Sequence, residues 1–433
     1  MLRPFFGLLH RYVGLTIAGF LIVSGLTGAV ISWTSELDRI LSPEIYYAPT
    51  SGPPKPAFEI ARQIEARYPQ VQVSEILFEP DEPGLATGFG VSPRVNPATG
   101  KLFEPGFNSV YVDPATGIET GKVAAGEPWP ITRANFMSFL YVLHYSLHIP
   151  ELWGIDMWGA WLLGGIALLW TIDCFVGFYL TLPSRERSLP TTAAPSTRSW
   201  WQRWKPAWKI RRKGGSYKLN FDIHRAFSLW TWGLLFIIAF TAFSLNLYRD
   251  VFFPAMSAIS NVTPTPFDTR APTDRHKPIA AKIGFERALD IGRQGAAARG
   301  WDGKAAEMYY ANQYGIYGVV FPRPGDGHDG IGGVGHREIY IDGLNGRILG
   351  DRRPWHGTAA DIFVQAQFPL HSGRILGIPG RILSSLIGLV VATLSITGLV
   401  IWWRKRAARV LRARRTSRRA EPGFGDGVAV PAE

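Results

Sequence analysis

The sequence predicts a membrane protein that is mainly α-helical, with a four-transmembrane-helix bundle and two small extracytoplasmic α+β parts. Three observations lead to this fold class: four long apolar windows, an uneven placement of basic residues, and features that recur in both halves of the chain. Of the 433 residues, 46% are apolar and only 18% are charged. Together with the length of the windows, this composition excludes an ordinary soluble enzyme.

Each window has about twenty or more residues with almost no charge, which is enough to cross roughly 30 Å of hydrocarbon. The windows cover residues 13–33, 154–182, 226–247 and 376–403. The first is too long for a typical signal peptide and has no A-x-A cleavage site, so we expect it to be retained. No broken helix is evident in any window. This argues against a transporter built from repeated halves.

Basic residues are concentrated on one side of the windows. The terminal segments and the segment between the second and third windows hold 22 of the 46 basic residues and 5 acidic ones, whereas the other two segments hold 23 basic and 27 acidic residues. The positive-inside rule then places both termini in the cytoplasm. Residues 34–153 and 248–375 are expected outside, in the periplasm of a Gram-negative cell. Topology and anionic lipid account for the net charge of +12, so no nucleic-acid partner is expected.

The two halves repeat the same features in the same order. His10-Arg11 is followed by Thr27 at the same offset that separates His224-Arg225 from Thr241, and residues 159–177 match residues 380–398 without a gap. Each half also has an amphipathic helix, then short strands that end in a glycine turn. These segments are 57–68 and 111–117 in the first half, and 282–299 and 340–346 in the second. The chain is therefore expected to hold two copies of one unit.

This repetition sets the predicted organisation of the chain. Between the second and third helices, Trp200, Trp201, Trp204 and Trp208 alternate with Arg and Lys, which is typical of a helix in the lipid headgroup layer. The predicted segments are helix 1 (1–33), extracytoplasmic module 1 (34–143), helix 2 with its outer entry (144–183), the basic Trp-rich linker (184–223), helix 3 (224–247), module 2 (248–370), helix 4 (371–403) and the basic tail (404–433).

Histidines carry most of the chemical information. The single cysteine, Cys174, lies inside the second window, which excludes disulfides within the chain and cysteine-ligated cofactors. His10 and His224 lie at the cytoplasmic ends of helices 1 and 3. His371 lies at the outer end of helix 4, and the duplication brings it level with His144 and His148. Neutral imidazoles from two helices can hold a haem iron from both sides, so these residues are candidate metal ligands.

Two points stay open at this stage. Counting forward from the strand repeats favours His144 as the partner of His371, and counting back from the window repeats favours His148. If this stretch is helical the two share a face, so one would ligate and the other would bind a propionate or the substrate.

Asp173 is the acidic residue well inside a window, and such a carboxylate is a functional candidate by default. It would accept a proton from a quinol or orient the surroundings of the inner haem.

Several motifs resemble the PepSY-associated transmembrane family, and most closely its inner-membrane ferric-siderophore reductases. They are Leu-His-Arg-Tyr-Val-Gly-Leu at 9–15, Trp-Lys-Pro-Ala-Trp-Lys-Ile-Arg at 204–211, Phe-Asp-Ile-His-Arg at 221–225, Phe-Pro-Leu-His-Ser-Gly-Arg at 368–374 and Ser-Ile-Thr-Gly-Leu-Val-Ile-Trp at 395–402. The resemblance implies two PepSY-like modules and two b-type haems. The implied ligands are His10, His224, His371 and one of His144 and His148, and the candidate cofactor-binding set also includes Arg11 and Arg225.

The resemblance implies an oxidoreductase of iron uptake. Electrons from a cytoplasmic or quinol donor would cross the lipid bilayer of the inner membrane through the two haems and reach a periplasmic ferric siderophore. Because oxygen chelators hold ferrous iron far less well than ferric iron, reduction would release the metal as Fe(II). The alternative is a non-enzymatic regulator whose modules act on a peptidase or another envelope process. Such a regulator would need no histidine pairs.

Overall fold

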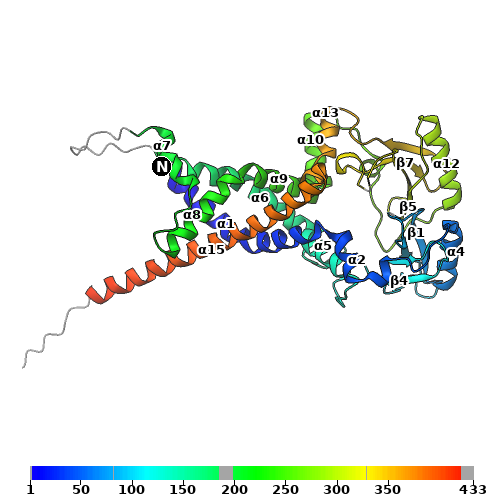
Figure 1. The fold of residues 1–433 in the computed structure, drawn as a ribbon, viewed down its shortest axis with the longest axis horizontal. Coiled ribbons are helices and arrows are strands. Elements are labelled where there is room, and N and C mark those ends of the chain that lie inside the picture. Colours follow the sequence, from blue (N-terminus) through cyan, green and yellow to red (C-terminus); the bar gives the residue numbers. More distant parts are fainter. Residues whose placement is uncertain (1, 81, 185–197, 328, 421–433) are drawn as a thin grey trace, which may run out of the picture. The chain divides into compact units, whose positions relative to one another are not determined.

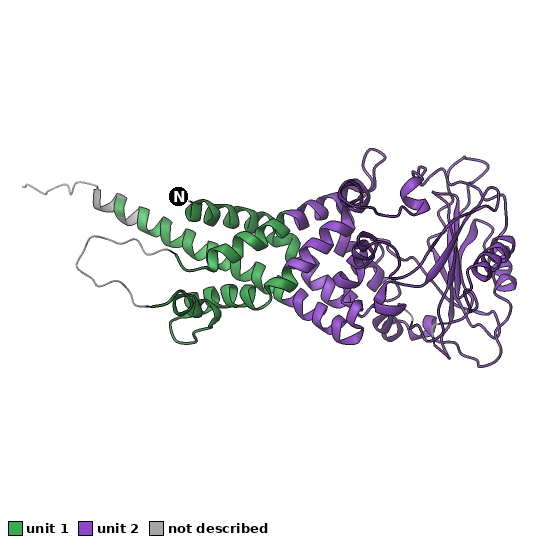
Figure 2. Cartoon of the chain, turned by 90° about the horizontal axis from the view of Figure 1, so that it is seen from above, with its two compact units in different colours: residues 1–22, 169–235, 390–433 green, residues 23–168, 236–389 purple. Residues whose placement is uncertain are grey.

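The computed structural model describes residues 2–80, 82–184, 198–327 and 329–420. The chain forms two compact units, and each contains residues from both sequence halves (Figure 2). Unit 1 comprises residues 1–22, 169–235 and 390–433, and unit 2 comprises residues 23–168 and 236–389. Residues 185–197 of the predicted linker and 421–433 of the predicted tail lie outside the described residues.

Three described helices are long and apolar enough to cross a membrane: α1 (Leu2–Ile31), α6 (Trp158–Thr181) and α15 (Ile378–Ala420), the last through its residues Ile378–Ala413. The third predicted window differs. It is covered by α8 (Ser216–Trp230) and α9 (Trp232–Asn246), which meet at Thr231 with a bend of 73°. Our expectation of unbroken windows was wrong here. The Thr231 hydroxyl bonds to the carbonyl of Phe227 one turn earlier, at 2.7 Å, an interaction that often bends helices. The bent pair makes a fourth span if it is counted as one.

Shorter helices connect these spans to the strands. In unit 2, α5 ends at Ser146, and Leu147 follows in a left-handed conformation. The short α-helices of this unit are α2 (Thr34–Leu41), α3 (Pro43–Tyr46), α5 (Phe136–Ser146), α10 (Phe253–Ile259), α11 (Pro266–Thr269), α13 (Ala359–Gln365) and α14 (Gln367–Ser372). The π-helical turn η2 (Tyr248–Phe252) and the 3₁₀ turns η3 (Ile331–Gly333) and η4 (Arg374–Leu376) complete the set.

The eight strands among the described residues join in one antiparallel sheet of order β4-β3-β2-β1-β5-β6-β7-β8. The two predicted modules are therefore halves of a continuous sheet. They meet where β1 pairs with β5, with Ile76 opposite Met308. The strands are β1 (Val71–Leu77), β2 (Thr87–Pro93), β3 (Ser109–Val112), β4 (Glu119–Val123), β5 (Glu307–Ala311), β6 (Ile316–Phe321), β7 (Arg337–Asp342) and β8 (Ile348–Arg352).

The register of the strands repeats between the two halves of the sheet. Tyr111 in β3 lies opposite Gly88 and Gly121, and Tyr340 in β7 lies opposite Gly318 and Gly350. Each tyrosine is followed by a shift of register in the next residue pair. The duplication predicted from residues 111–117 and 340–346 is confirmed in these strands.

The two expected amphipathic helices are confirmed as α4 (Ala57–Arg67) and α12 (Phe285–Ala298). Both cover the same face of the sheet (Figure 1). Their apolar stripes bury Ile60, Ile64 and Leu289 against Val110 and Ile339 in one continuous core. Burial of apolar surface on this face supplies the main driving force for the sheet to form.

In unit 1, the described part of the linker forms α7 (Trp200–Trp204), the 3₁₀ turn η1 (Lys205–Trp208) and the beginning of α8. Ser199 and Gln202 form a capping box that starts α7. Trp204 is buried against Leu229 and Phe178, whereas Trp201 is 68% exposed. One indole therefore fixes the segment to the helices of its own unit, and others remain available to a lipid surface.

Candidate ligand histidines in two facing pairs

Unit 1 brings His10 of α1 and His224 of α8 together as the first histidine pair. The centroids of their rings are 6.2 Å apart. Each ring lies over a glycine: a Cβ on Gly177 would meet Cε1 of His10 at 3.5 Å, and one on Gly398 would meet Cε1 of His224 at 3.3 Å. These glycines leave room for the rings between the helices.

Hydrogen bonds fix the tautomer of both rings. Nδ1 of His224 lies 3.0 Å from the carbonyl of Leu394, which only accepts, so Nδ1 carries the proton. Oγ1 of Thr397 lies 3.0 Å from the same nitrogen. Nδ1 of His10 lies 2.9 Å from both carboxylate oxygens of Asp173. In both rings Nε2 is left with its lone pair, the form that binds metals.

Unit 2 brings His144 of α5 and His371 of α14 together as the second histidine pair. Their ring centroids are 6.0 Å apart. Thr27 lies 3.0 Å from Nδ1 of His144, and Thr241 lies 3.0 Å from Nδ1 of His371. Both threonine hydroxyls donate to a carbonyl of their own helix, so each accepts from the imidazole N–H. The second pair therefore also presents Nε2.

His148 does not lie in this pair. Its Nε2 bonds to the carbonyl of Phe139 at 2.9 Å, and its ring stacks on the Phe139 ring at 4.5 Å. His144 and His148 would share a face only in a continuous helix, and this condition is not met, because α5 ends at Ser146 and both Leu147 and His148 have positive φ. The chain turns between the two histidines, and only His144 faces His371.

The separation of each pair suits two ligands of one metal. Imidazole nitrogens bind transition metals at about 2 Å, so two rings on opposite sides of one ion have centroids roughly 6 Å apart. Among the described residues, no group of three or more His, Cys, Asp or Glu side chains is arranged to hold a metal ion. Each pair would supply two ligands to a metal, and the remaining positions would come from another group. A porphyrin supplies four nitrogens in the plane between two axial imidazoles.

The first pair lies in a cavity of about 420 Å³ within unit 1. Arg11 and Arg225, the predicted cofactor-binding cations, both line it, as do Lys405 and Arg409. Nη2 of Arg225 bonds to Asp222 at 3.0 Å and to the carbonyl of Pro206, while its Nε is buried without a hydrogen-bond partner in the described chain. These cations suit a ligand that is apolar in its body and anionic at its edge, as haem is.

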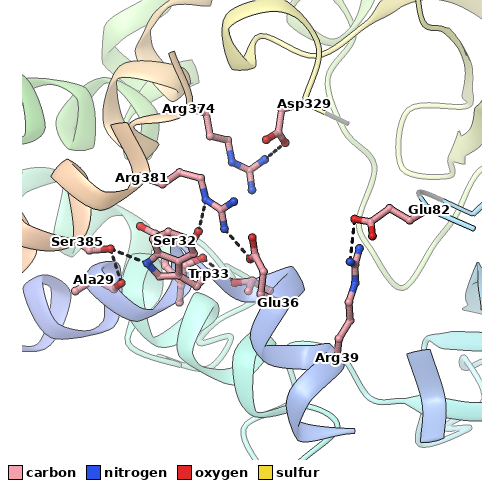
Figure 3. Close-up of polar contacts among 12 residues, drawn as sticks. Ala29, Ser32, Trp33, Glu36, Arg39, Glu82, Asp329, Arg374, Arg381 and Ser385 are labelled. Carbon is pink, nitrogen blue, oxygen red and sulfur yellow. Dashed lines mark hydrogen bonds and ion pairs between the residues drawn. The ribbon is translucent and has the colours of Figure 1, made fainter. Parts of the chain in front are cut away.

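Polar contacts within unit 2 hold the segment that carries His371 (Figure 3). Arg381 of α15 bonds to the Ser32 carbonyl at 2.8 Å and to Glu36 at 2.6 Å. Its guanidinium also lies over the Trp33 ring, 4.4 Å from the centroid. Arg374, three residues after His371, pairs with Asp329. The charge of Arg381 inside the fourth window is thus neutralised by an acidic neighbour.

Of the residues that orient the imidazoles, sequence reasoning singled out Asp173, which bonds to His10, but it assigned no role to the threonines and glycines. Thr27 and Thr241 were visible as a repeated spacing from His10 and His224, but their contacts are with the other histidine pair. Gly177 and Gly398 were visible only as the matched ends of 159–177 and 380–398. The sequence offered one indication of their role: these threonines and glycines recur in both halves of the chain, as the histidines do.

A family model described as the PepSY-associated TM region matches residues 8–405. No curated protein matches the sequence. The matched residues include all four histidines of the two pairs.

Proposed function

Because the chain belongs to the PepSY-associated transmembrane family, we propose that this membrane protein is a di-haem b-type reductase. It moves electrons from the cytoplasmic side of the inner membrane to a ferric siderophore in the periplasm and releases the iron as Fe(II). In this proposal the membrane part is a bundle of four spans, and the two halves of the sheet are PepSY-like modules.

The two histidine pairs carry the proposal. His10 with His224, and His144 with His371, have ring centroids 6.2 and 6.0 Å apart, and in each of the four rings Nδ1 meets an oxygen of the chain. A structural role at a membrane interface requires neither a facing partner nor a matched tautomer. Four imidazoles arranged as two axial pairs are what two b-type haems require.

The residues of the chain have distinct roles in this mechanism. A haem bound by either pair supplies a one-electron carrier. Nε2 of the two histidines of a pair would hold the haem, while Asp173 and the threonines hold Nδ1. Arg11 and Arg225 would bind the propionates in the first pair's cavity.

The proposed direction rests on the charges of the chain. By the positive-inside rule, the basic linker and tail would lie in the cytoplasm together with both termini, and residues 34–153 and 248–375 would lie outside. Electrons would therefore enter near the first pair, from a cytoplasmic or quinol donor, and leave near the second. One electron reduces one Fe(III) of the siderophore to Fe(II), which the chelator's oxygen donors hold weakly.

Purified full-length protein tests the cofactor. A pyridine haemochrome assay after expression with adequate iron and haem should give two b-type haems per chain. His224→Ala should reduce this to one haem. A peptidase regulator would carry no haem, and His224→Ala would leave its activity unchanged. Wild-type protein without haem therefore contradicts the proposed function.

Reoxidation kinetics test the substrate. Protein reduced with dithionite and freed of excess reductant should be reoxidised by a ferric hydroxamate siderophore, and a chromogenic ferrous chelator should collect one Fe(II) per electron. The gallium complex of the same siderophore is the matched control, because it has the same shape and charge but cannot be reduced under these conditions. Equal reoxidation with both complexes, or none with either, contradicts reduction of this substrate.

A further inference from the structure

The duplication provides an internal comparison for the first histidine pair. The ungapped match of residues 159–177 with 380–398 places Asp173 at the position of Leu394 and Val176 at the position of Thr397. His224 uses the backbone carbonyl of Leu394 and the hydroxyl of Thr397, both neutral. At the matching place, His10 meets the carboxylate of Asp173. The two halves thus hold equivalent rings with different charges.

The carboxylate is not needed to orient the ring. Thr27, Thr241 and Thr397 hold Nδ1 of the other three histidines at 3.0 Å with a hydroxyl. Asp173 is 8% exposed, and burying a carboxylate inside a membrane span is expensive. A neutral residue would fix the same tautomer at lower cost, so the charge itself needs an explanation.

A carboxylate bonded to a ligating histidine acts on the metal through the ring. It raises the basicity of the imidazole, and its negative charge favours the higher charge state of the bound ion. We propose that Asp173 is a positioning residue that makes the haem of His10 and His224 harder to reduce than the haem of His144 and His371. This inference rests on the proposed function. Because the first haem would then have the lower reduction potential, electron transfer from the first pair to the second would be favourable.

Redox titration of the purified full-length protein tests the proposal, with the two midpoint potentials read from the haem absorbance. In Asp173→Asn the lower midpoint potential should rise by about 59 mV or more. For a one-electron couple, this corresponds to a change of at least tenfold in the equilibrium constant of reduction. The higher potential should not move, and two haems should remain. Titration in a His371→Ala background, which keeps only the first site, identifies the haem that shifts.

Two further variants control for structural damage. Asp173→Leu with Val176→Thr copies the neutral arrangement of the second half onto the first, and it should raise the lower potential as Asp173→Asn does. Thr397→Val removes a neutral partner from His224, the other ring of the same pair, while the Leu394 carbonyl remains, so its effect should be much smaller.

Failure of the inference is distinguishable from failure of the proposed function. Two haems in both Asp173 variants with an unchanged lower potential overturn the inference and leave the reductase intact. Loss of the first haem from both variants also overturns it, because Asp173 would then be needed only to retain the cofactor. Wild-type protein without haem contradicts the proposed function itself.

Discussion

Thr241 accepts a hydrogen bond from Nδ1 of His371 at 3.0 Å while its own hydroxyl proton goes to the carbonyl of Ile237 at 2.7 Å. The same arrangement links Thr27, His144 and the carbonyl of Val23. In each case a hydroxyl committed to its helix leaves only a lone pair for the histidine. The backbone of one helix thus determines the tautomer of a ring on another.

Removing these hydroxyls should weaken haem binding at the second pair. Thr27→Val and Thr241→Val keep the shape of the side chain but leave the imidazole N–H without its acceptor. We expect about 10–100-fold weaker retention of that haem, measured as haem transfer to apomyoglobin. Thr16→Val is the control, because the Thr16 hydroxyl bonds only to its own helix, at the carbonyl of Tyr12. Equal retention in all three variants would contradict the role of the hydroxyls.

His144 and His148 should respond differently to substitution. His144→Ala removes a ring that faces His371, so the protein should keep one haem per chain. His148→Ala removes a ring stacked on Phe139 and should leave two. The haemochrome assay and the reduced spectrum distinguish the two results. The reverse pattern would show that His148 is the ligand and that the facing geometry of His144 is not used.

Side chains larger than glycine should displace the rings of the first pair. In Gly398→Leu the added carbons enter space where even a Cβ would be 3.3 Å from His224. We expect loss of one haem with the other retained, seen as a halved haem-to-protein ratio. Gly19→Leu adds the same volume to an exposed position of α1 with nothing within 4 Å, and it should keep both haems. Two haems in Gly398→Leu would show that this glycine is not required.

The turn after β7 should lose stability in acid. Burial alone would raise the pKa of Asp342, but hydrogen bonds from Arg270 and from the Leu344 amide outweigh it and hold this pKa below its usual value. Its contribution is therefore present at neutral pH and lost as pH falls through the lowered pKa. Asp342→Asn should destabilise the sheet by about 1 kcal/mol at pH 7, and the difference from wild type should shrink towards pH 3.

Urea unfolding in detergent, followed by circular dichroism, measures this effect. The exposed Asp290 of α12 offers a matched control, since Asp290→Asn removes the same charge without breaking a described contact. A gap between wild type and Asp342→Asn that stays constant from pH 7 to pH 3 would contradict the linkage.

The sequence was informative where a physical constraint acts along the chain. Apolar length identified the spans, and the repeat brought His10 to His224 and His371 to the His144/His148 region. The choice between His144 and His148 depended on where α5 ends. The helix ends in a left-handed turn at two non-glycine residues, Leu147 and His148. No local sequence pattern predicts a turn at these residues.

Long-range features were beyond the reach of the sequence. The bend at Thr231 lies in an apolar window that hydropathy reads as continuous. The pairing of β1 with β5 depends on which free strand edges meet once the chain has folded. The residue pattern within each module does not predict this pairing. Asp173 was recognised as unusual, but its partner His10 became evident only when two distant helices were placed together.

The pairing of Glu75 with Tyr309 has a consequence for how the protein is made. β1 is an interior strand in the finished sheet, but β5 is synthesised more than two hundred residues later. Until then the open side of β1 presents unsatisfied backbone groups to any other extended chain. A chain truncated before β5 should therefore be prone to aggregation, even though the four strands of its first module are complete.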